Sequence, residues 1–172
     1  NYPDFVVLEK ERLKVINGTL LITFYTPLIN VKQKRDEIEA DLDQIIASTD
    51  LNNPQIIEFY EFRQYAQNLV AYKLNKKLRD QNIEITSAET YAKEYFVVLE
   101  ELFFDKVVLE ELYYNFMKDF MAFYGAETVL EQYSRYKMIS SNKKRLGELD
   151  KIFSEYDKLS AGNPSVEWSF PD

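Results

Sequence analysis

Two adjacent glutamate pairs are the side chains whose spacing most suggests chemistry. Glu100-Glu101 and Glu110-Glu111 lie in an octamer that occurs twice, at residues 97–104 and 107–114. Paired carboxylates can hold two metal ions in a helical bundle, but that architecture also uses Glu-x-x-His, and the chain has no His. Neighbouring residues on a helix also point about 100° apart, so at most one acid of each pair would face inward. We therefore predict no metal site and assign these acids to the solvent.

Missing residue types remove further reaction classes. The sequence contains no Cys and no His, which excludes thiol nucleophiles, histidine bases, Cys/His zinc sites and haem ligation by either residue. With four glycines in all, no glycine-rich phosphate loop occurs. An enzyme that uses only carboxylates or tyrosines stays open, because any two acids can meet in space. We expect no catalytic residue, no cofactor and no metal.

Composition points to one folded, acidic domain. The 172 residues are 46% hydrophobic, too apolar for a disordered chain. A net charge of −8 repels phosphate backbones, so we expect no nucleic-acid partner. The longest uncharged run, residues 15–31, is too short and too broken to span a membrane. The 13 Tyr and 12 Phe could line a ligand groove, but at helical spacing aromatic residues more often form a core.

The N-terminal residues favour strands. Residues 5–8 are β-prone, and Asn17-Gly18 stands between the apolar run 13–16 and the β-branched run 19–25. Asn-Gly between two such runs is a strong hairpin signal, because both central residues of a type I′ turn need φ > 0. The sequence therefore predicts a short β-hairpin within residues 1–30.

Beyond residue 31 the apolar period becomes helical. We predict helices over residues 31–48, 54–80, 86–104, 105–124, 126–138 and 142–159. Through the doubled octamer the chain could continue as one helix or break near Asp105; a break avoids an apolar band too wide for one partner. If the chain breaks there, the helix over residues 105–124 would bury six apolar residues, Leu109, Leu112, Tyr113, Phe116, Phe120 and Phe123. The expected fold is mainly α, a multi-helix bundle with a short N-terminal β-hairpin (1–30), a helical domain (31–160) and an extended C-terminal tail (161–172).

The tail does not have the pattern of a helical bundle. Residues 162–172, Gly-Asn-Pro-Ser-Val-Glu-Trp-Ser-Phe-Pro-Asp, resemble the beginning of a thioredoxin-like domain of the TlpA/AhpC-TSA type, which commonly opens with Gly-x-Pro-Ala-Pro-x-Phe-x-Leu-x-Asp. Val166 stands where the second proline often occurs, and Trp168 replaces the phenylalanine. Residues 5–9 with 26–30 are similar to the closing strands of the β-sandwich domain that often precedes the helical region in these proteins. Tyr25 replaces a glycine of that pattern, and Ile29 is inserted.

This resemblance implies a part of an exported, often lipid-anchored thiol–disulfide oxidoreductase of a Gram-negative bacterium, located in the periplasm or outer cell envelope. Its catalytic Cys-x-x-Cys would follow Asp172, so no catalytic residue is carried over. The chain would then be a non-catalytic accessory domain that positions the thioredoxin-like domain or recognises its client, with Trp168 and Phe170 at the interdomain contact. The alternative is a stand-alone helical binding or adaptor protein in which these two residues pack on the bundle. In both interpretations the partner is a protein.

Overall fold

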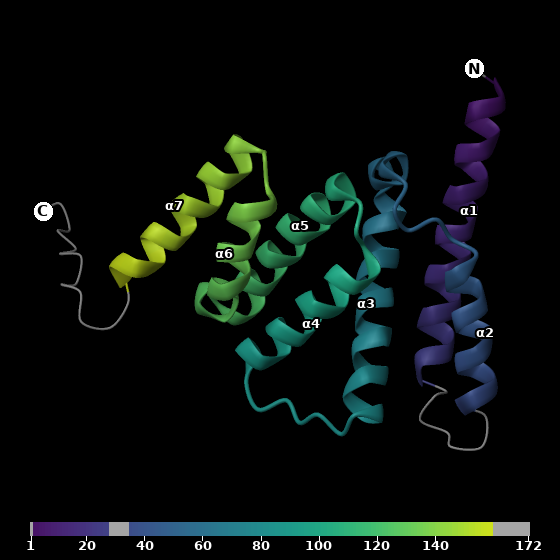
Figure 1. The fold of residues 1–172 in the computed structure, drawn as a ribbon, viewed down its shortest axis with the longest axis horizontal. Helices are drawn as coiled ribbons and strands as arrows, with labels where there is room; N and C mark the ends of the chain where they lie inside the picture. The colour runs from purple at the N-terminus through teal and green to yellow at the C-terminus, as the bar shows by residue number, and fades with distance from the viewer. Residues whose placement is uncertain (1, 28–34, 160–172) are drawn as a thin grey trace, which may run out of the picture.

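The protein is described by a computed structural model of residues 2–27 and 35–159 (Figure 1). These residues form seven α-helices and two 3₁₀ helices, and they contain no strand. The elements are α1 (Tyr2–Tyr25), α2 (Arg35–Ala47), η3 (Pro54–Glu58), α3 (Tyr60–Asp80), α4 (Ala88–Leu102), α5 (Lys106–Tyr124), η4 (Ala126–Val129), α6 (Leu130–Ile139) and α7 (Lys143–Leu159). The mainly α class is thus confirmed, whereas the predicted tail (161–172) lies outside the described residues.

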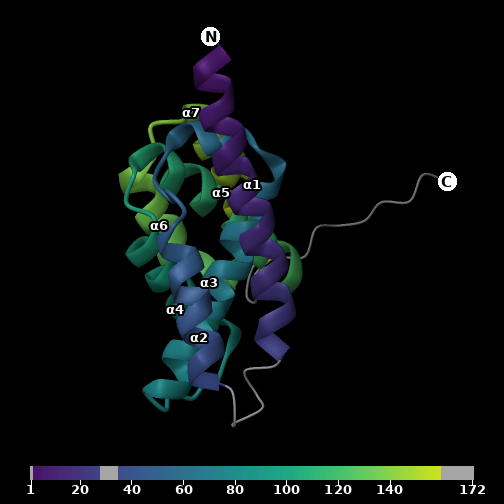
Figure 2. The same cartoon turned by 90° about the vertical axis from the view of Figure 1, so that its right-hand side faces the viewer.

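The helices follow one another across the molecule. In Figure 1, α1 and α2 form one edge, α3 lies beside them, α4 and α5 follow, and α7 forms the opposite edge. The view turned by 90° shows α1 running along the outside of this edge (Figure 2). α1 packs against α3 and α2, α5 packs against α4 and α6, and α7 contacts η4. The described chain therefore has an N-terminal layer of three helices and a C-terminal layer of four.

The predicted N-terminal β-hairpin is wrong, because α1 passes through Asn17-Gly18 without a turn. Gly18 is buried, and a Cβ there would stand 2.5 Å from Cε2 of Tyr65, so the missing side chain lets α1 approach α3 closely. Val15 and Ile22 are buried and recur with Gly18 at helical spacing. Packing on α3 outweighs the local turn and strand preferences of this segment.

Threonine hydroxyls also adapt the β-branched run to a helix. Thr19, Thr23 and Thr26 each donate a hydrogen bond to the backbone carbonyl four residues earlier, at 2.9, 2.8 and 2.6 Å. Such back-bonding satisfies the hydroxyl within the helix and needs no strand partner. The residues that suggested a strand are therefore compatible with α1.

The predicted break near Asp105 is confirmed. The Asp105 carboxylate accepts hydrogen bonds from the backbone amides of Val107 and Val108, at 2.9 and 3.1 Å, and so caps α5. Asn52 fixes the same junction from another loop, because its side-chain oxygen accepts from the amides of Phe104 and Asp105, at 2.7 and 2.8 Å. The doubled octamer thus forms two helices that can pack against each other.

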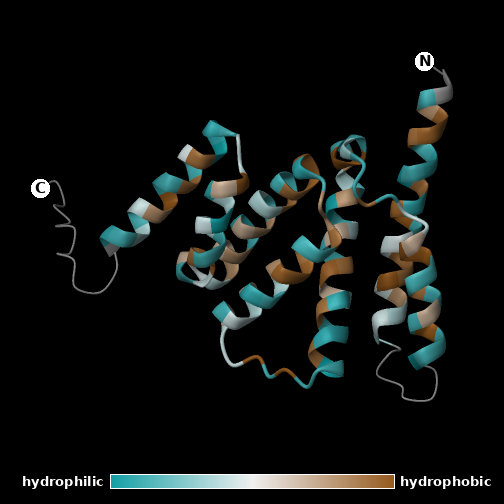
Figure 3. Ribbon diagram, viewed as in Figure 1, coloured by the Kyte–Doolittle hydropathy of each residue, from teal (hydrophilic) through white to brown (hydrophobic). Residues whose placement is uncertain are grey.

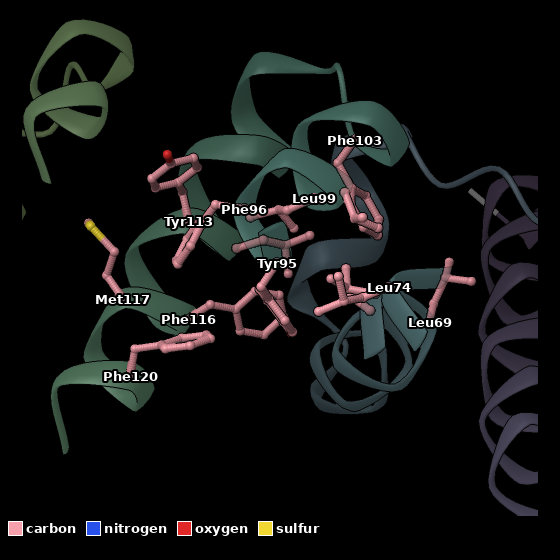
Figure 4. Packing of buried hydrophobic residues seen from close by; sticks show 14 of the residues in the cluster. Leu69, Leu74, Tyr95, Phe96, Leu99, Phe103, Tyr113, Phe116, Met117 and Phe120 are labelled. Atoms are coloured by element: carbon pink, nitrogen blue, oxygen red, sulfur yellow. The ribbon is translucent and has the colours of Figure 1, made fainter. Parts of the chain in front are cut away.

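The core lies where α3, α4 and α5 meet. Hydrophobic and hydrophilic segments alternate along these helices, as they also do along α7 (Figure 3). Aromatic and aliphatic side chains from the three helices interlock (Figure 4), among them Leu69, Leu74, Tyr95, Phe96, Leu99, Phe103, Tyr113, Phe116, Met117 and Phe120. The ring centroids of Phe96 and Tyr113 lie 4.6 Å apart, which joins α4 to α5. Most of the aromatic residues therefore form a core, as their spacing predicted.

Candidate functional site

The two residues predicted to contact a partner, Trp168 and Phe170, lie outside the described residues. α7, the last described helix, ends at Leu159, ten residues after its buried Leu149. The roles of Trp168 and Phe170 therefore stay predictions.

Three of the four paired glutamates, Glu100, Glu110 and Glu111, contact other helices, although we had assigned all four to the solvent; Glu101 is exposed, as predicted. Glu100 accepts two hydrogen bonds of 3.1 Å from Arg135 of α6. Glu110 accepts from the Ser140 hydroxyl at 2.7 Å and from the Asn142 backbone amide at 3.2 Å, at the start of α7. Within residues 2–27 and 35–159 no group of three or more Asp or Glu side chains is arranged to hold a metal ion. Glu100, Glu110 and Glu111 hold α6 and α7 to the helices of the core.

An open groove between α3, α4 and α5 is the best candidate for a binding site. Its volume is about 290 Å³, and most of its lining residues are aromatic. The lining comes from one residue of α3, two of α4 and five of α5, namely Gln67, Tyr91, Tyr95, Phe116, Asp119, Phe120, Phe123 and Tyr124. We call it the aromatic groove. Concave sites with a mainly apolar lining and a few polar groups are the usual places for ligands.

Helical spacing gathers these side chains. Tyr91 and Tyr95 are four residues apart on α4, and Phe116, Phe120 and Phe123 follow one face of α5. Tyr95, Phe116 and Phe120 are buried and form the floor. The floor is rigid because Tyr95 lies edge-on to both phenylalanines, with centroid distances of 5.6 and 5.2 Å (Figure 4).

The rim of the groove is exposed. Phe123 is 80% exposed and Tyr124 is 52% exposed, while Tyr91 is half-buried. Phe123 had been predicted to be buried, and this prediction is wrong: it lies in the last turn of α5, at the open rim of the groove. Sequence spacing placed it correctly on the apolar face of α5, but no signal along the chain shows how far that face is covered.

Polar groups stand at one side of the aromatic groove. Nη2 of Arg63 on α3 donates to both carboxylate oxygens of Asp119, at 2.9 and 2.8 Å. The Gln67 side chain makes no hydrogen bond within the described part of the chain. Asp119 and Gln67 therefore offer hydrogen-bond acceptors, and Gln67 also a donor, beside an apolar floor.

Burial keeps the hydroxyls of two tyrosines of the aromatic groove, Tyr91 and Tyr95, protonated. Burial raises the pKa of Tyr95, and the negative charge of Asp119 adds to this effect. Burial also raises the pKa of Tyr91. Both phenols are thus neutral at physiological pH, and neither provides a phenolate nucleophile.

Comparison with models of protein families, with curated proteins and with solved structures finds no match for this chain. Among the described residues, no helix has the length and apolar character needed to cross a bilayer.

Proposed function

We propose that this chain is a non-catalytic helical accessory domain of an exported thiol–disulfide oxidoreductase, located in the periplasm or outer envelope of a Gram-negative bacterium and anchored by lipid upstream. In this role it positions a thioredoxin-like domain or binds the client of that domain. The observation that carries the proposal is the similarity of residues 162–172 to the beginning of a TlpA/AhpC-TSA domain, directly after the last helix of the bundle.

The arrangement of the helices supports this role. α7 lies at the edge of the molecule opposite α1, so a domain that follows α7 would be held away from the N-terminal layer (Figure 1). The aromatic groove lies between these edges, on the helices that form the core. The N-terminal half of the resemblance gives less support than the sequence suggested, because residues 5–9 belong to α1 and not to a strand.

The test is to read the coding sequence beyond Asp172 and to assay both forms of the protein. We expect a Cys-x-x-Cys motif to follow, disulfide reductase activity in the longer chain, and none in residues 1–172, which have no Cys. Removal of the helical domain should change the KM for a protein client and leave turnover of a small disulfide unchanged. A stop codon after Asp172, or thiol-dependent turnover by residues 1–172, would contradict the proposal.

A stand-alone helical binding or adaptor protein is the second candidate, and the exposed aromatic rim favours it. Such a protein would need no following domain, and its tail would pack on the bundle through Trp168 and Phe170. Limited proteolysis of residues 1–172 separates the two candidates. A tail that resists cleavage supports the stand-alone protein, and cleavage between residues 160 and 172 supports the accessory domain.

A further inference from the structure

Five contacts between a cation and an aromatic ring occur among the described residues, and none of them involves a ring of the aromatic groove. Lys73 lies 5.6 Å from the ring centroid of Tyr72, and Lys137 lies 4.3 Å from that of Tyr133. Two cations cover Tyr114, and one covers Phe59. Within the described residues, no Lys or Arg stands over Tyr91, Phe123 or Tyr124. A cation gains energy over an aromatic face, and the rim rings are open to one, as are isolated exposed rings such as Phe104. In the part of the chain that the structure describes, only at the groove do several such rings lie together beside a carboxylate.

The charges around the aromatic groove also favour a cation. Asp119 is the single charged residue among those that line it, and no Lys or Arg does so. The whole chain carries a net charge of −8, which attracts basic partners at a distance. Aromatic rings with a carboxylate at one side form the usual surroundings of a bound guanidinium or ammonium group.

Arg63 already contacts Asp119. Elsewhere in the protein, the Glu39 carboxylate accepts hydrogen bonds from two cationic side chains. Glu39 on α2 accepts from Lys76 and from Nη2 of Arg79, the latter at 2.5 Å. Arg63 approaches Asp119 through a single nitrogen atom, which leaves lone pairs of both carboxylate oxygens for a second donor. At Glu39 each cation contacts a different oxygen, whereas Arg63 contacts both oxygens of Asp119, so a second cation at Asp119 would use the remaining lone pairs beside Arg63.

We propose that the aromatic groove binds an arginine or lysine side chain of a partner protein. The cationic group lies over the rings of the rim and donates to Asp119, while the aliphatic part of the side chain covers the buried floor. The volume of about 290 Å³ accommodates one such side chain. This inference rests on the proposed function only in assuming that the partner is a protein.

The experiment uses NMR spectra of the ¹⁵N-labelled chain titrated with an acetylated and amidated Gly-Arg-Gly peptide. We expect shifts at the amides of Gln67, Tyr91, Phe123 and Tyr124. The same peptide with citrulline in place of arginine keeps the shape and loses the charge, so it should bind about tenfold more weakly. Equal binding of the two peptides, or shifts confined to other surfaces, would overturn the proposal.

Two phenylalanines with almost equal exposure provide a matched pair of variants. Phe123→Leu changes the rim of the aromatic groove, and Phe104→Leu changes a residue that is 78% exposed and does not line it. Both variants should fold, because neither side chain is buried. We expect Phe123→Leu and Asp119→Asn to weaken binding of the arginine peptide several-fold and Phe104→Leu to leave it unchanged.

Further arms identify the source of the cation. If tetramethylammonium bound more tightly than the arginine peptide, the result would overturn the proposal in favour of a small organic cation. Failure of the peptide to bind would contradict the groove proposal and leave the reductase assay unaffected, whereas a stop codon after Asp172 would contradict the accessory role and leave the peptide titration unaffected. The two proposals can therefore fail separately.

Discussion

Gly18 and Gly147 both lie inside helices, but only Gly18 has a neighbour where a side chain would stand. A Cβ on Gly18 would meet the ring of Tyr65 at 2.5 Å, and Tyr65 is fully buried between α1 and its neighbours. A Cβ on Gly147 would meet nothing within 4 Å. One glycine is therefore required by packing, and the other only weakens α7.

We expect Gly147→Ala and Gly18→Ala to change the stability in opposite directions. Alanine should raise the free energy of unfolding by about 0.5–1 kcal/mol at position 147, where it only improves helix propensity. At position 18 the displacement of Tyr65 should cost about 1–3 kcal/mol, which exceeds that gain. Urea unfolding of both variants followed by circular dichroism measures the difference. Equal stabilisation by both substitutions would show that α1 does not approach α3 as closely as described.

Residues whose role is local were predictable, and residues whose role depends on a distant neighbour were not. Asp105 caps α5 through the amides two and three residues further along the chain, so the neighbouring sequence is enough to predict this role. Gly18 depends on Tyr65, 47 positions away, and its local pattern predicted a turn. Phe123 was placed on the correct face of α5, but its exposure depends on residues outside its own helix.

At the scale of elements, the helices after residue 31 were largely predicted, with differences at their ends. Asn53 caps η3, and α3 starts only at Tyr60, whereas one helix had been predicted over residues 54–80. Ser87 caps α4, which begins at Ala88 and not at residue 86. Helix ends depend on a few weak hydrogen bonds, whereas the apolar period extends over the whole helix and is the stronger signal.

The last helix is held by polar contacts as well as by a narrow apolar face. Leu149 and Phe153 are its buried residues, and Phe153 stacks on Tyr133 with a centroid distance of 4.1 Å. The Tyr133 hydroxyl donates to Asp150, and Arg145 pairs with Glu111 at 2.5 Å. α7 is thus an element whose attachment can be weakened without changing the core.

Tyr133→Phe should loosen α7 and leave the remaining helices folded. Loss of the hydrogen bond to Asp150 should lower stability by about 1 kcal/mol, while the stacking on Phe153 is kept. Hydrogen exchange should become faster over Lys143–Leu159 and stay unchanged in α3. Tyr60→Phe is the control, because Tyr60 is 85% exposed. Unchanged exchange in α7 would mean that the bond to Asp150 does not hold it.

At the scale of the whole molecule, the unusual feature is a core rich in tyrosine. Burial is the first cause of a raised pKa at eight tyrosines, and for two of them, Tyr114 and Tyr133, the pKa rises to about 12. The others are Tyr65, Tyr72, Tyr91, Tyr95, Tyr113 and Tyr136. The folded state thus holds these phenols in the neutral form, whereas the unfolded chain ionises them near pH 10.

This core predicts an alkaline limit to stability. An acid whose pKa is raised by folding stabilises the folded state fully below its unfolded pKa, and the contribution is lost as the pH rises through the folded value. Because the chain has no His and no Cys, the free energy of unfolding should change little between about pH 6 and 9 and fall steeply above about pH 10.

Parallel titrations of helicity and of tyrosinate absorbance test this limit. Because the buried phenols ionise only when the core opens, we expect the tyrosinate absorbance of these eight residues to appear together with the loss of helical circular dichroism above about pH 10. Tyr133→Phe serves as the internal comparison, since it removes one raised pKa and should make the alkaline loss of stability slightly less steep. Full ionisation of the tyrosines near pH 10 with the helices intact would contradict a core in which these rings are buried, and would place them in contact with water.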